Sequence, residues 1–102
     1  MLYHLTTTAD WESGRGPDSF APRSLATEGF VHLSGSAQVA GTASRFFADR
    51  TDVILLEIDE TKLTPEVVWE NLYGHGAFPH LYGPIALAAV VRAEPYSPER
   101  VL

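Results

Sequence analysis

The sequence predicts an α+β fold with a small split sheet of mixed or antiparallel strands, one long helix and one short helix. Two observations favour this class: several short apolar stretches have the composition of strands, and only one longer stretch has helical spacing. Strands and helices do not alternate regularly, as they would in a parallel α/β fold. With 102 residues, 45% of them hydrophobic and 20% charged, we expect a single domain over residues 1–102.

The chain begins with a predicted strand and a predicted short helix. Residues 2–6 alternate around Tyr3 and His4, which is typical of a strand. Thr7 and Asp10 have the spacing of a helix-capping signature, so a short helix is expected to run through Trp11.

Residues 13–28 are rich in glycine, proline and serine, a composition typical of a loop. We expect at most one helical turn in this segment, near residues 24–27, and we expect Phe20 to anchor the segment to the core. A loop of this length is unusual in a compact domain and is often a functional lid.

Residues 29–34 are the second predicted strand, and Gly35 and Ser36 then turn the chain into the long helix, expected from about residue 37 to residue 49. Apolar side chains recur along this helix at helical spacing, which predicts one buried face. The predicted face consists of Val39, Ala40, Ala43, Phe46 and Phe47.

The second half of the chain contains further predicted strands. Residues 53–58, VILLEI, are nearly all apolar, which predicts a central strand that is covered on both faces. Residues 67–70 and 78–82 are predicted strands on either side of a glycine-rich segment, and residues 85–91 are the last predicted strand.

Composition and charge exclude several classes of function. The absence of cysteine excludes disulfides, thiolate zinc sites and thiol nucleophiles. The net charge is -6 and the basic residues are scattered singly, so no basic stripe is present to bind nucleic acid. A small anionic ligand is still compatible with the sequence, because a single arginine such as Arg45 can bind a phosphate or form a local salt bridge.

No apolar stretch approaches the roughly 20 residues that a membrane-spanning helix needs, so no membrane partner is expected. The first residues, MLYHLTTTADW, lack the basic start, apolar region and cleavage site of a signal peptide. We therefore expect a cytoplasmic protein that is mature as written, with a monomer as the default assembly.

The dipeptide His-Leu occurs at three predicted strands, and two of its copies are followed by a hydroxyl residue. His4 shares a strand face with Thr6, and His32 shares one with Ser34, because side chains two apart point to the same side. An imidazole beside a hydroxyl can hydrogen-bond a sugar diol or a phosphate and can exchange protons near neutral pH. The structural alternatives are a solvated histidine at position 4 and a buried, hydrogen-bonded histidine at position 32.

The third copy, His80, is followed at the same strand spacing by Tyr82, whose ring could stack on a flat ligand. Glu70 ends the preceding predicted strand and could face the same cleft, or it could simply be solvated. His75 lies between glycines in a predicted flexible turn and is the weakest candidate.

The residue types alone are compatible with two kinds of site, a phosphoesterase site and a metal site. Paired H-x-[S/T] strands occur in two-histidine phosphoesterases, where the histidines act as general acid and base, but those enzymes need a longer chain. His4, His32 and His80 could together bind zinc, nickel or copper, yet no single element has the spacing of metal ligands. Both remain minor alternatives, and no metal is predicted.

The ordered strings YHLT, EGFVHLS, QVAGTASRFF, VILLEID, VVWEN and FPHLYGPI, followed by AAVV, span nearly the whole chain. This set closely resembles the domain-of-unknown-function 952 family of short, uncharacterised bacterial proteins. The resemblance implies the ADP-ribosylation-like fold of the ADP-ribosyltransferase-like superfamily, in which NAD binds in a cleft between two small, roughly perpendicular half-sheets.

The resemblance also implies roles for particular residues. His4 and Thr6 match a first-strand histidine and hydroxyl that contact the adenosine-side ribose and the nicotinamide amide, and a second-strand position lining the nicotinamide falls on His32. A later acidic residue would bind the nicotinamide ribose as positive charge develops there. In this chain His80 stands at that position, and Glu70 lies one predicted strand earlier.

We therefore expect a protein that binds NAD or a related ADP-ribose-type nucleotide and that transfers or hydrolyses ADP-ribose. The alternative is a non-catalytic module that uses the same cleft to sense a nucleotide or to contact a protein. The expected catalytic residues are His32, Ser34, Glu70 and His80. The expected nucleotide-binding residues are His4, Thr6, Tyr82 and Arg45.

Overall fold

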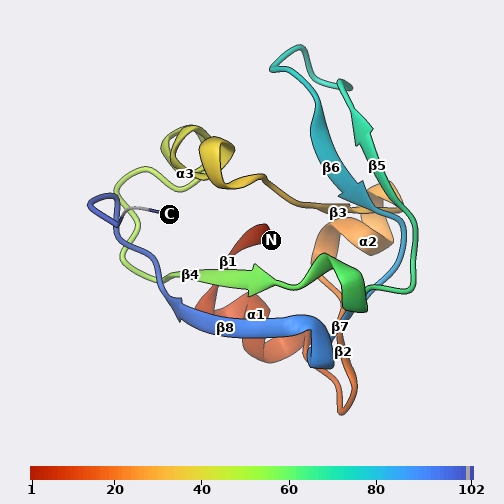
Figure 1. The fold of residues 1–102 in the computed structure, drawn as a ribbon. Coiled ribbons are helices and arrows are strands. Elements are labelled where there is room, and N and C mark those ends of the chain that lie inside the picture. Colours follow the sequence, from red (N-terminus) through yellow and green to blue (C-terminus); the bar gives the residue numbers. More distant parts are fainter. Residues whose placement is uncertain (101) are drawn as a thin grey trace.

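The computed structural model describes residues 1–100 and 102 as three antiparallel sheets with short helices around them (Figure 1). The strands are β1 (Leu2–Thr7), β2 (Ser19–Phe20), β3 (Val31–His32), β4 (Val53–Ile58), β5 (Val67–Glu70), β6 (Phe78–Leu81), β7 (Ile85–Ala86) and β8 (Val90–Pro95). The α-helices are α1 (Thr8–Gly14), α2 (Arg23–Glu28) and α3 (Val39–Phe46). Short 3₁₀ helices span Ser36–Gln38, Glu60–Lys62 and Leu87–Ala89. The predicted α+β class is confirmed.

The first sheet has the strand order β1-β4-β8, so β4 is its central strand, as the VILLEI sequence predicts. Its alternating side chains enter two separate core clusters, one on each face of the sheet. Leu56 and Ile58 pack in one cluster with Phe20, whereas Leu55 packs in the other with Val39 of α3. Both faces of β4 are therefore covered, and β1 is left at the edge of the sheet.

The second large sheet has the order β3-β6-β5 and places His32 directly opposite His80. Its end joins the first sheet where the backbones of Tyr3 and Ser34 exchange two hydrogen bonds of 2.8 Å. The edge strand β1 is thereby held against the end of β3. Figure 1 shows the two sheets extending in different directions from this junction.

The sequence correctly predicts the start of α1, because the Thr7 side chain accepts a hydrogen bond from the backbone N–H of Asp10 at 3.2 Å. Helix α2 ends at Gly29, whose φ of 87° lies in the left-handed region that glycine favours. Its N–H donates to the carbonyl of Leu25 at 3.1 Å, and the chain then turns directly into β3. None of the helices in the described residues has the length and apolar character required to cross a membrane.

The predicted long helix is wrong in length, because a 3₁₀ turn precedes α3 and the α-helix spans only Val39–Phe46. Only part of its predicted apolar face is buried: Val39 and Ala43 are, whereas Ala40 is exposed and Phe46 is 66% exposed. The described helices are therefore all short, and the contrast between one long and one short helix disappears.

Two predicted strands and one predicted loop also need correction. The strand predicted over residues 29–34 is paired regularly only at β3, because the chain leaves β6 after Leu33, whose N–H donates to the carbonyl of Pro79 at 3.0 Å, and joins β1 at Ser34 instead. The strand predicted over residues 85–91 is broken by a 3₁₀ turn into β7 and the start of β8, which belong to different sheets. In the predicted loop at residues 13–28, the expected helical turn is the slightly longer α2 and Phe20 is buried in the core as predicted, but β2, which pairs with β7, was not predicted.

Candidate functional site

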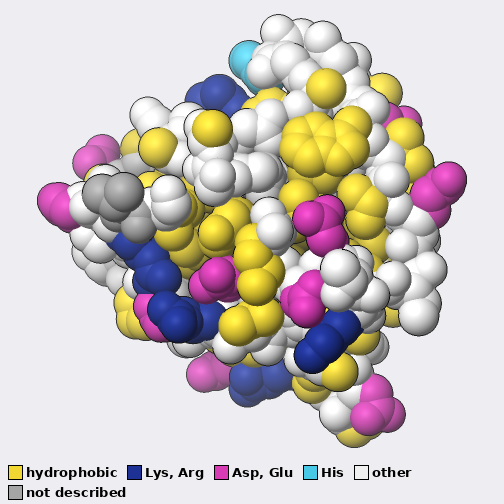
Figure 2. Space-filling view, in the orientation of Figure 1, with side chains coloured by type: hydrophobic (Ala, Val, Ile, Leu, Met, Phe, Trp, Pro, Cys, Tyr) yellow, Lys and Arg dark blue, Asp and Glu magenta, His cyan; other side chains and the backbone are white. Residues whose placement is uncertain are grey.

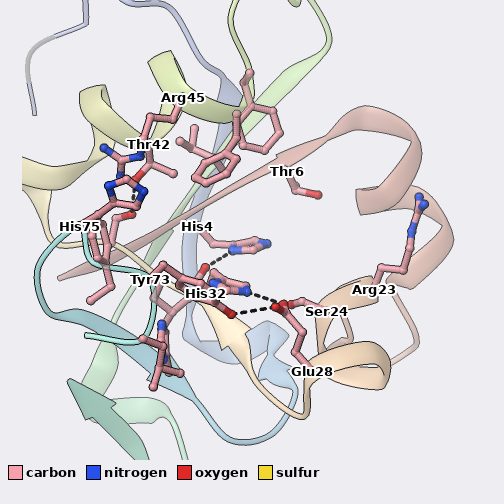
Figure 3. A pocket seen from close by; sticks show the side chains of 18 of the residues that line it. His4, Thr6, Arg23, Ser24, Glu28, His32, Thr42, Arg45, Tyr73 and His75 are labelled. Atoms are coloured by element: carbon pink, nitrogen blue, oxygen red, sulfur yellow. Dashed lines mark hydrogen bonds and ion pairs between the residues drawn. The ribbon is translucent and has the colours of Figure 1, made fainter. Parts of the chain in front are cut away.

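A cavity of about 610 Å³ lies along the edge strand β1, where the two large sheets meet (Figure 3). This volume falls within the roughly 300–1,000 Å³ typical of small-molecule sites. The predicted site residues that line it are His4, Thr6, His32, Ser34, Arg45, Glu70 and His80. Tyr82 is the exception, because it does not line the cavity and reaches it only through Glu70. His75, the weakest candidate from sequence, also lines the wall.

His32 forms a hydrogen-bonded triad with Glu28 and Tyr73, which we call the His32 triad. The His32 Nε2 lies 2.6 Å from Glu28 Oε2, and the Tyr73 hydroxyl donates to Glu28 Oε1 at 2.8 Å. These bonds, that from His32 first, lower the pKa of Glu28, and the bond to Glu28 raises the pKa of Tyr73. Because the ionised carboxylate can only accept, His32 Nε2 carries a proton and donates it to Glu28.

His80 forms a second triad, with Glu70 and Tyr82, which we call the His80 triad. The His80 Nδ1 lies 2.9 Å from Glu70 Oε1, and the Tyr82 hydroxyl donates to the same oxygen at 2.5 Å. These bonds, that from Tyr82 first, lower the pKa of Glu70. The side chain of His80 is only 2% exposed and its ring stacks on Phe30 at 4.3 Å between ring centroids. The His80 ring is therefore held rigidly in the wall.

His4 is buried, so the alternative of a solvated edge-strand histidine is wrong. Its Nδ1 lies 2.6 Å from the backbone carbonyl oxygen of His32. A carbonyl oxygen can only accept, so Nδ1 donates the proton and Nε2 has the lone pair. Burial lowers the pKa of His4 from its ordinary value of 6.5 to about 4, so the ring is neutral at physiological pH.

The hydroxyl groups expected beside the histidines are present at the cavity. Thr6 and Ser34 are both buried lining residues, and Ser34 Oγ lies 3.4 Å from the hydroxyl of Thr42 on α3. Periodicity correctly places Thr6 on the face of His4. Figure 3 shows the side chains of His4 and Thr6 on the same side of β1.

Two arginines lie at opposite ends of the site in Figure 3. Arg23 forms an ion pair with Asp10, and both line the cavity. The guanidinium of Arg45 lies 5.7 Å from the ring centroid of Phe78, and no carboxylate in the described residues forms an ion pair with it. The local salt bridge considered for Arg45 is therefore not formed, and its charge is available to an anion.

The geometry gives no support to a metal centre. In residues 1–100 and 102, no three histidine, aspartate or glutamate side chains are grouped closely enough to bind a metal ion. In His4, His32 and His80, one ring nitrogen faces an oxygen acceptor of the protein and carries a proton. That nitrogen is therefore not available to bind a metal ion.

Two central residues of the site, Glu28 and Tyr73, are missed by the sequence analysis. Glu28 lies four positions before His32, a spacing that brings side chains together within a helix but predicts nothing across a helix end and a turn. Tyr73 comes from the segment between β5 and β6, 45 positions away from Glu28. Only the reversal at Gly29 and the course of that segment bring the three side chains together.

These features define a class: an α+β protein with a cavity between two antiparallel sheets, lined by histidines paired with carboxylates. A family model described as "Protein of unknown function (DUF952)" matches residues 5–93. The chain therefore belongs to the DUF952 family, as its GFVHLS and FPHLYGP strings predict.

Solved structures of one relative have the same fold. The crystal structure of protein CC0527 from Caulobacter crescentus is 28% identical, with 94% of this chain and 85% of that chain covered and a TM-score of 0.81. The solution NMR structure of CC0527 is also 28% identical, with 92% and 82% covered and a TM-score of 0.76. No curated protein matches the chain significantly.

Proposed function

We propose that the cavity binds NAD or a related ADP-ribose-type nucleotide. One cavity combines an unpaired cation, Arg45, an ionised carboxylate, Glu70, and aromatic walls that include Phe78 and Tyr73. A diphosphate needs the cation, flat bases need aromatic surfaces, and ribose hydroxyls need carboxylate or imidazole acceptors. This combination within a single cavity is the observation that supports a nucleotide ligand best.

The arrangement of the sheets is consistent with an ADP-ribosyltransferase-like origin. That fold binds NAD between two half-sheets, and here the cavity lies where the β1-β4-β8 and β3-β6-β5 sheets meet. His4 and Thr6 of β1 line one wall, and His32 lies at the end of β3. These positions match the order of the ligand-contacting residues that the resemblance implies.

Glu70 supplies the acidic side chain that the resemblance implies at the position where this sequence has His80. It lies on β5, which pairs with β6, and its Oε1 is bonded to the His80 ring. Its Oε2 has no hydrogen-bond partner in the described residues. Every buried side-chain nitrogen or oxygen atom there has such a partner, so Oε2 is not buried. Glu70 Oε2 is therefore accessible and can approach a ribose on which positive charge develops.

The test is a titration with ADP-ribose and with NAD, followed through the ring resonances of the histidines. We expect the signals of His4, His32 and His80 to shift with both nucleotides. Replacement of Arg45 by glutamine should weaken ADP-ribose binding by about tenfold or more, because a charged hydrogen bond contributes ~1.5–3 kcal/mol. Arg92, which pairs with Glu94 at 3.3 Å and does not line the cavity, gives the matched control Arg92→Gln.

Unshifted histidine signals at millimolar ADP-ribose would refute the nucleotide site. Equal weakening by the Arg45 and Arg92 variants would show that net charge, and not this cavity, determines binding. Binding without release of nicotinamide from NAD would favour the non-catalytic sensing module.

A further inference from the structure

The two triads use their glutamates differently. In the His32 triad both carboxylate oxygens of Glu28 are occupied, Oε2 by His32 and Oε1 by Tyr73. In the His80 triad, His80 and Tyr82 both bond the same oxygen of Glu70, Oε1. Each oxygen of Glu28 therefore accepts one bond from the protein, and these two bonds serve to fix the orientation of the His32 ring.

The ring of His32 is fixed with one nitrogen free. Its Nδ1 has no hydrogen-bond partner in the described residues. Every buried side-chain nitrogen there has a partner, so Nδ1 is accessible. The side chain is 40% exposed and lines the cavity. An imidazole whose Nε2–H is held by a carboxylate, with Nδ1 open to the ligand, has the arrangement of a general base.

We propose that His32 is the general base of this cavity, acting through Nδ1, and that Glu28 and Tyr73 are its positioning residues. The substrate class is an N-glycoside of ADP-ribose with a cationic leaving group, as in NAD. The inference rests on the proposed function, because the bound nucleotide supplies the bond that is broken.

The other two histidines fit this role less well. The side chain of His80 is 2% exposed and is stacked on Phe30, so its ring has little access to a substrate. His4, with a pKa of about 4, takes up a proton only in acid. Efficient proton transfer at neutral pH needs a base whose pKa lies near the working pH.

The reaction balances with water as the only co-reactant. A water molecule bonds through its oxygen to the anomeric carbon of the ribose, and its proton moves to His32 Nδ1. The bond from that carbon to the pyridinium nitrogen breaks, and its electron pair leaves with neutral nicotinamide. Glu70 Oε2 faces the positive charge that develops on the ribose, and the proton on His32 is then lost to solvent.

The test combines two measurements on the full chain. Long-range ¹H–¹⁵N spectra of the free protein at pH 8 report which His32 nitrogen is protonated. Nicotinamide release from NAD and the Kd for ADP-ribose are then compared among Glu28→Ala, Glu28→Gln, Tyr73→Phe and His32→Gln. Glu12→Gln and Tyr96→Phe are the controls, since neither side chain lines the cavity.

We expect His32 to be protonated at Nε2 in the wild type and to become a mixture of tautomers in Glu28→Ala. His32→Gln should slow nicotinamide release by about 100-fold, the lower end of the ~10²–10⁴-fold typical of general base catalysis. Glu28→Ala should slow it by about tenfold or more, with partial rescue by Glu28→Gln, while the Kd for ADP-ribose changes by less than about twofold. Tyr73→Phe should have a smaller effect in the same direction.

A His32 ring protonated at Nδ1 in the wild type would overturn the inference. So would a His32→Gln variant that releases nicotinamide at the wild-type rate. A wild-type protein that binds ADP-ribose but releases no nicotinamide would overturn the catalytic role and leave the nucleotide site intact. Failure to bind ADP-ribose would overturn the proposed function and the reaction together, and the Kd for ADP-ribose separates these two cases.

Discussion

The His32 triad and the His80 triad contain the same three residue types, and their histidines lie on the paired strands β3 and β6, but the two histidines differ in exposure. The side chain of His32 is 40% exposed and that of His80 is 2% exposed. Figure 2 shows hydrophobic side chains gathered on the face between α3 and the β5–β6 hairpin, with acidic side chains among them. The comparison teaches that the same three residue types can form a triad around a buried histidine or around an exposed one, and only the exposed histidine is open to a ligand.

The difference arises from the neighbours of each ring. Phe30 stacks on His80 with an angle of 23° between the planes, whereas it meets His32 at 58°. His80 also lies on β6, the central strand of its sheet, and His32 lies at the end of the short edge strand β3. We therefore expect mutations to separate the two triads, with stability lost at His80 and ligand chemistry lost at His32.

The largest stability difference should come from alanine substitutions of the two histidines. His80→Ala should lower the free energy of unfolding by about 3 kcal/mol, because it leaves a cavity and removes the buried partner of Glu70. His32→Ala should cost about 1 kcal/mol or less, since a half-exposed hydrogen bond contributes little. Urea unfolding at pH 7 measures both values. Equal losses would break the distinction between a structural and an open triad.

A second large effect should come from pH and the buried His4. Its folded-state pKa of about 4 lies below the ordinary value of 6.5, so the unfolded chain binds this proton first as the pH falls. The associated stability is present above pH 6.5 and is lost progressively down to about pH 4. Between pH 7 and pH 4.5 the loss from this group should be about 2–3 kcal/mol.

His4→Gln isolates that contribution, because glutamine does not titrate and can still donate to the His32 carbonyl. Urea unfolding of both proteins at the two pH values gives the difference, and titrating carboxylates affect both alike. If the variant and the wild type lose the same stability in acid, His4 is not a buried neutral base.

A smaller effect should follow removal of either tyrosine hydroxyl. Tyr73→Phe and Tyr82→Phe should each cost less stability than His80→Ala, because the bonds to Glu28 and Glu70 are exposed to solvent. Histidine ring resonances sharpen the comparison: Tyr73→Phe should perturb mainly His32, and Tyr82→Phe mainly His80. A shared response of both rings to either change would show that the triads act as one network.

The smallest stability effect should come from the cavity-lining Phe46, which is 66% exposed. Phe46→Ser should change the free energy of unfolding by less than about 0.5 kcal/mol, as is usual for exposed positions. Thermal unfolding measures this change, and Phe20→Ser, at a fully buried position, is the destabilising control. A large loss in Phe46→Ser would mean that α3 depends on this ring for packing.

The sequence by itself determined the α+β class, the strands that contain His4 and residues 53–58, the cap at Thr7 and the family. These features depend on local periodicity, capping chemistry and strings of adjacent residues, all of which are visible along the chain. Sequence periodicity also placed His4 and Thr6 on one face, since strand side chains alternate whatever the sheet contacts.

Only the tertiary structure decided which groups meet at the cavity. Glu28 reaches His32 across a helix end, Tyr73 reaches Glu28 from a distant segment, and Glu70 lies beside His80 because β5 pairs with β6. The burial that lowers the pKa of His4 depends likewise on packing against Phe20, from a small sheet that the sequence did not reveal. Long-range pairings of this kind depend on the burial of many residues at once, and short-range spacing has no information about them.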